Sequence, residues 1–114
     1  LVDRKRDVII SGAFNIYPKE IEDVIAAHPK VKEAAVIGVP DEKWGEAVKA
    51  VVVPKAGETV TEEEIIDHCR DRMAGFKKPK SVDVVDELPR NPYGKVQKTA
   101  LRERYWKGYD RRIH

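Results

Sequence analysis

The chain has 114 residues, of which 41% are hydrophobic, and 22 Lys and Arg against 20 Asp and Glu give it a net charge of +2. This length suits one folding unit with one core, and no apolar run is long enough to span a membrane or resembles a signal peptide. A single cysteine excludes an intramolecular disulfide, and the Cys and His residues lack the spacing of a metal site. We therefore expect a soluble cytoplasmic domain. Because the chain opens on Leu1 rather than methionine, we also expect it to begin inside a longer protein or after a removed segment.

The charge is distributed unevenly. From Phe76 onward 11 Lys and Arg stand against 5 Asp and Glu, a local charge of +6, so the first 75 residues carry −4. A basic C-terminal third indicates an anionic ligand. We do not expect nucleic acid, because the aromatic-rich strand or recognition helix of a common nucleic-acid module is missing.

The first elements expected are a hairpin and a helix. A β-branched run at residues 8–10 ends at a Ser-Gly pair, and residues 15–17 then lead to Pro18, which favours the first turn of a helix. The apolar spacing ends before His28, which precedes a proline. We interpret His28 as a helix-end residue rather than a catalytic base.

Two apolar runs follow, at residues 31–39 and 47–53, and a polar loop separates them. We expect them to pair antiparallel, with four residues near the core: Val36, Ile37, Val51 and Val52.

Thr61 and Glu64 then form a capping box that starts a second helix. The helical spacing runs through a buried Cys69 to Met73 and predicts an end near Gly75.

A last strand at residues 81–85 and a helix from about Thr99, packed by Tyr105 and Trp106, complete the expected elements. The order β-β-α-β-β-α-β-α predicts an α+β domain. Its expected form is a small, mostly antiparallel sheet with an N-terminal hairpin, flanked by about three helices.

A turn with the sequence Pro-Arg-Asn-Pro-Tyr-Gly-Lys occupies residues 89–95. The two prolines fix φ, and the glycine frees the backbone immediately before Lys95. A lysine placed in this way can reach phosphate or carboxylate oxygens as a point charge. Taken alone, the pattern is more typical of a plain turn that ends in a solvated lysine.

Four separated segments of the chain, the last of which contains Lys95, form a pattern that is far more specific than the turn alone. They are residues 3–22, 38–46, 76–80 and 94–98. Together they resemble the C-terminal domain of acyl-CoA synthetases, in the adenylate-forming family that also contains luciferases and the adenylation domains of peptide synthetases. The resemblance covers nearly the whole chain and fails only in the last ten or so residues. It implies a hinge at residues 1–7 that follows a large N-terminal domain, a C-terminal lid domain at 8–104 and a basic tail at 105–114.

The resemblance implies an ATP-dependent, AMP-forming acyl-CoA ligase that acts with Mg²⁺ on a carboxylic acid and then on CoA. Lys95 matches the lysine that bridges the acid and the α-phosphate during adenylation. The small domain then rotates on the large domain and supplies part of the CoA channel. The fragment alone is expected to be inactive, because the large domain binds most of the ATP and the acid. A medium or long fatty acid is slightly favoured, and aryl and short-chain acids remain open.

The resemblance also assigns the other candidate site residues. Arg4 matches a residue that contacts the ATP ribose, and Arg6 stands at the pivot, where aspartate or lysine is usual. Residues proposed to line the channel for the pantetheine of CoA are Ser11, Gly12 and Ala13, of which Ala13 replaces a common glycine. Residues that match the contacts to the nucleotide end of CoA are Trp44, Phe76, Lys78 and Lys80, where an aromatic face would stack on adenine and lysines would meet phosphates.

Simpler readings of these segments stay open at this point. The charged run at the hinge is equally consistent with a solvated linker, the Lys-Pro-Lys segment with a solvated loop, and Trp44 with a packed loop anchor. Two rival functions also stay open: an adenylation domain that loads a carrier protein, and a non-enzymatic binding module.

Overall fold

The computed structural model describes residues 8–12, 14–43 and 45–106, and within them the elements follow the predicted order. The fold is α+β, with a two-stranded hairpin, a three-stranded sheet and three α-helices. The elements are β1 (Ile9–Ser11), β2 (Phe14–Ile16), α2 (Pro18–Ala26), β3 (Val31–Asp41), β4 (Gly45–Pro54), α3 (Glu62–Arg70), the 3₁₀ helix η1 (Gly75–Lys77), β5 (Ser81–Val84) and α4 (Lys98–Trp106). None of the helices in this part of the chain is long and apolar enough to cross a membrane.

The main sheet has the strand order β3-β4-β5. As predicted, β3 and β4 pair antiparallel, in a register that runs from Val31 opposite Pro54 to Asp41 opposite Gly45. β5 pairs parallel with β4, so that Lys49 lies opposite Ser81 and the sheet is mixed. Parallel neighbours need a crossover connection, which α3 and η1 supply here.

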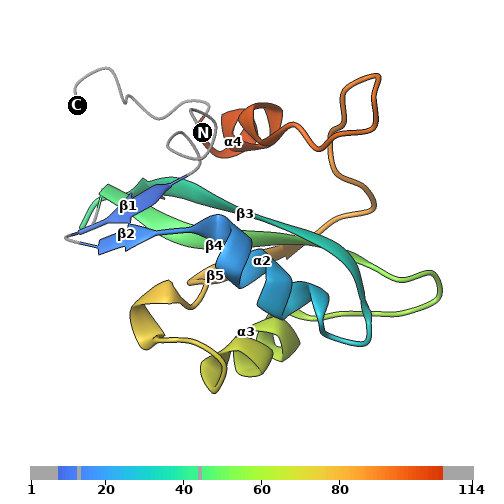
Figure 1. Cartoon of the computed structure of the whole chain (residues 1–114), viewed down its shortest axis with the longest axis horizontal. Coiled ribbons are helices and arrows are strands. Elements are labelled where there is room, and N and C mark those ends of the chain that lie inside the picture. Colours follow the sequence, from blue (N-terminus) through green and yellow to red (C-terminus); the bar gives the residue numbers. More distant parts are fainter. Residues whose placement is uncertain (1–7, 13, 44, 107–114) are drawn as a thin grey trace.

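Each face of the sheet carries its own core, because successive side chains of a strand point to opposite faces. On one face Val36 and Val52 pack with residues of α2 and α3, and on the other Ile37 and Val51 pack with Leu101 of α4. Figure 1 shows α2 and α3 on one side of the sheet and α4 on the other. The four residues predicted to lie near the core are therefore all buried, but in two separate clusters.

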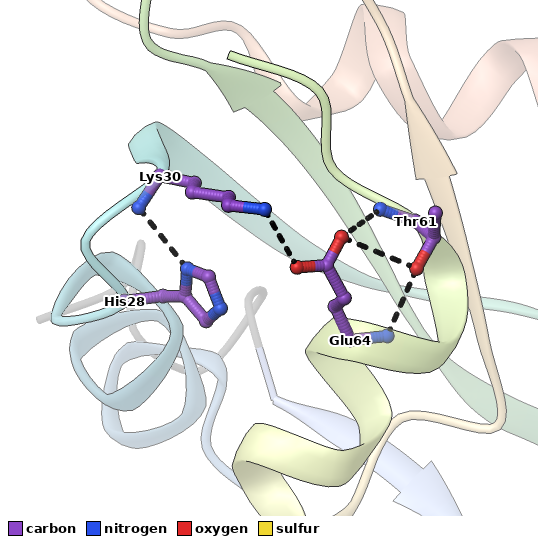
Figure 2. Close-up of polar contacts among 4 residues, drawn as sticks. All are labelled: His28, Lys30, Thr61 and Glu64. Carbon is purple, nitrogen blue, oxygen red and sulfur yellow. Dashed lines mark hydrogen bonds and ion pairs between the residues drawn. The ribbon is translucent and has the colours of Figure 1, made fainter.

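The capping box predicted for α3 is present. The Thr61 hydroxyl accepts the Glu64 N–H at 3.2 Å, and a Glu64 carboxylate oxygen accepts the Thr61 N–H at 3.0 Å. The second Glu64 oxygen lies 3.1 Å from the Lys30 ammonium, which ties α3 to the segment after α2 (Figure 2). Hydrogen bonds from Lys30 and from the Thr61 backbone lower the pKa of Glu64.

The predicted end of α3 near Gly75 is wrong, because the helix stops at Arg70 and Asp71 caps it. Met73 packs against the core as its spacing suggested, but it does so from the turn that follows the helix. Cys69 is fully buried as expected, and burial raises the pKa of its thiol to about 11.

The ends of the other two helices agree with the sequence. Pro18 occupies the first turn of α2, and His28 follows its C-cap, where its Nδ1 accepts the Lys30 N–H at 3.1 Å. At the end of α4 the Tyr105 hydroxyl donates to Asp83 on β5 at 2.6 Å, and the Trp106 indole donates to the Gly38 carbonyl on β3 at 3.0 Å. Both aromatic residues therefore fasten α4 to the sheet.

Candidate functional site

The turn that carries Lys95 is the centre of a short hairpin, called here the lysine hairpin (residues 89–97). The Gly94 N–H donates to the Asn91 carbonyl at 2.9 Å, and the four residues from Asn91 to Gly94 carry the sequence signature of a type I turn. Gly94 has a φ of 85°, a left-handed conformation that favours glycine. The chain can therefore turn sharply just before Lys95.

The backbone of Lys95 is held on both sides by Asn91. The Lys95 N–H donates to the Asn91 side-chain oxygen at 3.0 Å, and the Lys95 carbonyl accepts the Asn91 N–H at 2.9 Å. The same side-chain oxygen also accepts the Tyr93 N–H at 2.9 Å. The Lys95 side chain is exposed, and its ammonium has no hydrogen-bond or ion-pair partner among the described residues.

The hairpin is docked on the face of the sheet that α4 covers. Its two arms are joined by a bridge between Arg90 and Val96 and by a 2.8 Å hydrogen bond from the Gln97 N–H to the Pro89 carbonyl. Val96 packs against the cluster that contains Leu101. The base of the hairpin is thus fixed by packing, and its tip stays in solvent.

One side chain joins the hairpin tip to the sheet. The Arg90 guanidinium donates to the Gly94 carbonyl at 2.7 Å and pairs with the carboxylate of Glu33 on β3. Neither Glu33 nor Asn91 was predicted as a functional residue. The turn signature at Asn91 was visible in the sequence, whereas nothing in the sequence connects Glu33 with a residue 57 positions away.

The residues expected to line the CoA channel lie on the β1–β2 hairpin. Ser11 pairs with Phe14, so the loop between the strands has two residues, and Gly12 at its start has a φ of 61°. A positive φ at this position is required by both common two-residue hairpin turns. Gly12 is exposed, while Ala13 lies outside the described residues.

The segment expected to meet the nucleotide end of CoA runs from η1 to β5. Pro79 is fully buried, and the Lys80 N–H donates to the Val48 carbonyl at 2.8 Å, so the backbone here is anchored to the sheet. Lys78 is half-buried and Lys80 is exposed. Phe76 lies within η1.

The two groups of candidate residues lie at different ends of the molecule. In Figure 1 the orange segment with the lysine hairpin lies on the α4 side, while the β1–β2 turn and η1 lie at the far end of the sheet. The structure therefore brings the candidate CoA segments to one end and separates them from Lys95. The remaining candidates, Arg4, Arg6 and Trp44, lie outside the described residues.

Among the described residues no group of three or more His, Cys, Asp or Glu side chains could hold a metal ion. We therefore assign no Mg²⁺ ligand to these residues.

Comparison with known proteins identifies the class of domain. The family model for the AMP-binding enzyme C-terminal domain matches residues 20–95, so the chain belongs to this family. It is 52% identical over 103 residues to 3-[(3aS,4S,7aS)-7a-methyl-1,5-dioxo-octahydro-1H-inden-4-yl]propanoyl:CoA ligase of Rhodococcus jostii, covering 90% of this chain and 20% of that protein. It is 53% identical over 103 residues to long-chain-fatty-acid–CoA ligase FadD13 of Mycobacterium tuberculosis, with the same two coverages of 90% and 20%.

Solved structures agree with this assignment. ATP-bound MatB from Rhodopseudomonas palustris superposes with a TM-score of 0.87 at 50% identity, covering 92% of this chain and 21% of that one. The chain thus spans about a fifth of the length of the relatives that it matches.

Proposed function

We propose that this chain is the mobile C-terminal domain of an AMP-forming acyl-CoA ligase and that Lys95 is its catalytic residue for adenylation. The observation that supports this most directly is the lysine hairpin. It presents one exposed ammonium from a backbone that is hydrogen-bonded on both sides of Lys95. Because the backbone of Lys95 is fixed before the reaction, only its side chain has to be ordered when the two anions bind.

The first half-reaction brings two anions together. A carboxylate oxygen of the acid attacks the α-phosphorus of ATP, a new P–O bond forms, and the bond to pyrophosphate breaks. Positive charge near both reactants stabilises this transition state. In the proposal the Lys95 ammonium contacts the acid and the α-phosphate, orients them and forms no covalent bond.

The second half-reaction belongs, in this proposal, to the other end of the molecule. The thiol sulfur of CoA attacks the acyl carbon of the adenylate, the C–O bond to AMP breaks, and the thiol proton leaves to solvent. Ser11, Gly12 and Ala13 would line the pantetheine path, and Lys78 and Lys80 would meet phosphates with Trp44 and Phe76 near adenine. Because these segments and Lys95 lie at opposite ends, a rotation about Arg6 would exchange them, with Arg4 on the ribose.

In this proposal the residues that select the acid lie outside this domain. The two relatives named above are 52% and 53% identical to this chain, yet their names specify a fused-ring propanoate and a long-chain fatty acid. Equal similarity to enzymes with different acids supports the proposal that the choice of acid is made elsewhere in the whole protein. A fatty acid is the first substrate to test.

The test is acid-dependent exchange of labelled pyrophosphate into ATP by the intact ligase that contains this domain, with a panel of acids. Lys95→Ala should lower the exchange rate by about 10²- to 10³-fold. Lys55→Ala, which removes an exposed lysine from an unrelated turn, is the matched control and should leave the rate unchanged.

The outcomes separate the proposal from its rivals. Exchange that survives Lys95→Ala would refute the role of Lys95. Normal exchange without any thioester formation on free CoA would indicate a carrier protein as the acyl acceptor. No exchange with any acid would favour a non-enzymatic module.

A further inference from the structure

We infer that Glu33 and Arg90 are positioning residues that orient Lys95 for adenylation, an inference that rests on the proposed function. The two side chains form a chain of polar contacts from strand β3 to the peptide group that precedes Lys95. These contacts with the sheet thereby set the orientation of the lysine hairpin.

The contacts converge on a single peptide unit. The Gly94 carbonyl accepts a hydrogen bond from Arg90 Nη1 at 2.7 Å, while the N–H of the same peptide, that of Lys95, donates to Asn91 Oδ1 at 3.0 Å. Both polar atoms of the Gly94–Lys95 peptide are therefore held by side chains. The plane of this peptide sets the direction in which the Lys95 side chain leaves the backbone.

The second nitrogen of the guanidinium faces the sheet. Arg90 Nη2 pairs with Glu33 Oε1, and the Arg90 and Glu33 side chains are 39% and 23% exposed. A guanidinium is planar and presents its nitrogens in a fixed fork, so one arm determines where the other points. Since Glu33 belongs to β3, its contact with Arg90 fixes the orientation of the Gly94–Lys95 peptide relative to the sheet.

The contacts of Arg90 with Glu33 and with the Gly94 carbonyl are additional to the backbone hydrogen bonds that close the hairpin. Backbone hydrogen bonds join its arms, and Val96 packs on the core beneath it. Losing Arg90 would therefore leave a closed hairpin whose tip is free to tilt. Glu33 also balances the charge of Arg90, so that Lys95 remains the exposed cation of the hairpin without an anionic partner among the described residues.

The experiment uses the intact ligase that contains this domain and measures the two half-reactions separately. Arg90→Ala and Glu33→Gln should each lower kcat for acid-dependent pyrophosphate exchange by about tenfold, because a misplacement of about 1 Å already costs up to 10²-fold. KM for ATP and for the acid should stay within about twofold, and thioester formation from added acyl-AMP should be unchanged. Arg90→Lys keeps the charge without the fork and should rescue the rate only in part.

A double-mutant comparison separates positioning from a general structural effect. In a Lys95→Ala background, Arg90→Ala should cause no further loss, since the residue that it orients is gone. Lys30→Ala breaks another partly exposed ion pair, with Glu64 of α3 on the face of the sheet opposite α4, and should leave pyrophosphate exchange at the wild-type rate. Circular dichroism of each variant checks that it folds. If Arg90→Ala does not fold, Arg90→Lys and Glu33→Gln test the inference in its place.

Full pyrophosphate exchange in Arg90→Ala, an additional loss in the Lys95→Ala background, or an equal loss in both half-reactions would each overturn the inference. If Lys95→Ala itself retains exchange, the proposed function falls and the inference falls with it. If Lys95→Ala loses exchange while Arg90→Ala retains it, the inference alone fails.

Discussion

The lysine hairpin and the opposite end of the sheet hold their candidate residues in different ways. In the hairpin, polar side chains surround the backbone of an exposed lysine, and Asn91 and Arg90 fix the peptide that carries it. At the other end a fully buried Pro79 and a backbone bond to Val48 anchor the segment between η1 and β5. The first arrangement orients the backbone from which one charged side chain extends, and the second holds a segment of backbone in place against the sheet.

The difference suggests a division of labour. A group that must meet two anions in a transition state needs direction, whereas a path for a long flexible ligand needs backbone that is accessible and stable. The two regions lie at opposite ends of the sheet (Figure 1), so under the proposed function we expect them to meet the adenylate in two different orientations of this domain.

Removing the core beneath the hairpin should have the largest effect on stability. Leu101→Ala deletes a fully buried side chain of α4, and we expect the free energy of unfolding to fall by about 3 kcal/mol. Ile65→Ala, equally buried on the opposite face, should cost about the same. Thermal or urea unfolding measures both, and only Leu101→Ala should also slow pyrophosphate exchange; equal slowing in both would argue against separate roles for the two faces.

Gly94→Ala tests the turn itself. With a φ of 85° and no atom within 4 Å of the added methyl, the cost is one of backbone conformation, about 1 kcal/mol. Gly57 has a φ of 79° and equally open surroundings, so Gly57→Ala is a matched control with the same expected loss of stability. Adenylation should fall only in Gly94→Ala, and a similar fall in both variants would show that the conformation at Gly94 has no special role.

Lys78→Ala examines the other end. If this half-buried lysine meets a CoA phosphate, its loss should raise KM for CoA by about two- to fivefold, the range expected for a partly exposed charge pair. Pyrophosphate exchange should not change, and Lys55→Ala serves again as the control. An unchanged KM for CoA would remove Lys78 from the proposed site.

The smallest effect concerns His28, which lies in neither region. Burial, and after it the charge of His68, lowers the pKa of His28, while Glu64 opposes this shift and Lys30 and Arg72 add to it. The unfolded chain therefore takes up this proton at a higher pH than the folded chain does, so stability falls as pH drops below about 6.5. Figure 2 shows the contact at risk, in which His28 Nδ1 must be unprotonated to accept the Lys30 N–H.

Melting temperatures at pH 7.5 and 5.5 measure this dependence. His28→Gln should weaken the fall in melting temperature at low pH and leave both half-reactions unchanged at pH 7.5. A pH dependence that His28→Gln does not alter would assign it to other groups.

Local features of the fold could be predicted from the sequence. The capping box at Thr61, the proline that starts α2 and the turn before Lys95 each depend on neighbouring residues, and the structure has all three. The antiparallel pairing of β3 and β4 followed from two apolar runs joined by a short loop.

Features of the fold that depend on residues far apart in the chain could not be predicted from the sequence. The parallel pairing of β5 with β4 is set by the crossover through α3, and the early end of that helix leaves chain for the crossover to turn back. The contact between Glu33 and Arg90 joins residues 57 positions apart, and no periodicity marks it. The roles of all the candidate site residues remain predictions, and Arg4, Arg6, Ala13 and Trp44 also lie outside the described part of the chain.

The most direct test of the account compares Lys95→Ala and Lys78→Ala in both half-reactions of the intact ligase. Pyrophosphate exchange measures adenylation, and thioester release from added acyl-AMP and CoA measures the second step. We predict that Lys95→Ala abolishes most adenylation and spares thioester formation, while Lys78→Ala spares adenylation and weakens the use of CoA. If either variant slowed both half-reactions to the same extent, the assignment of the two ends to two different steps would be contradicted.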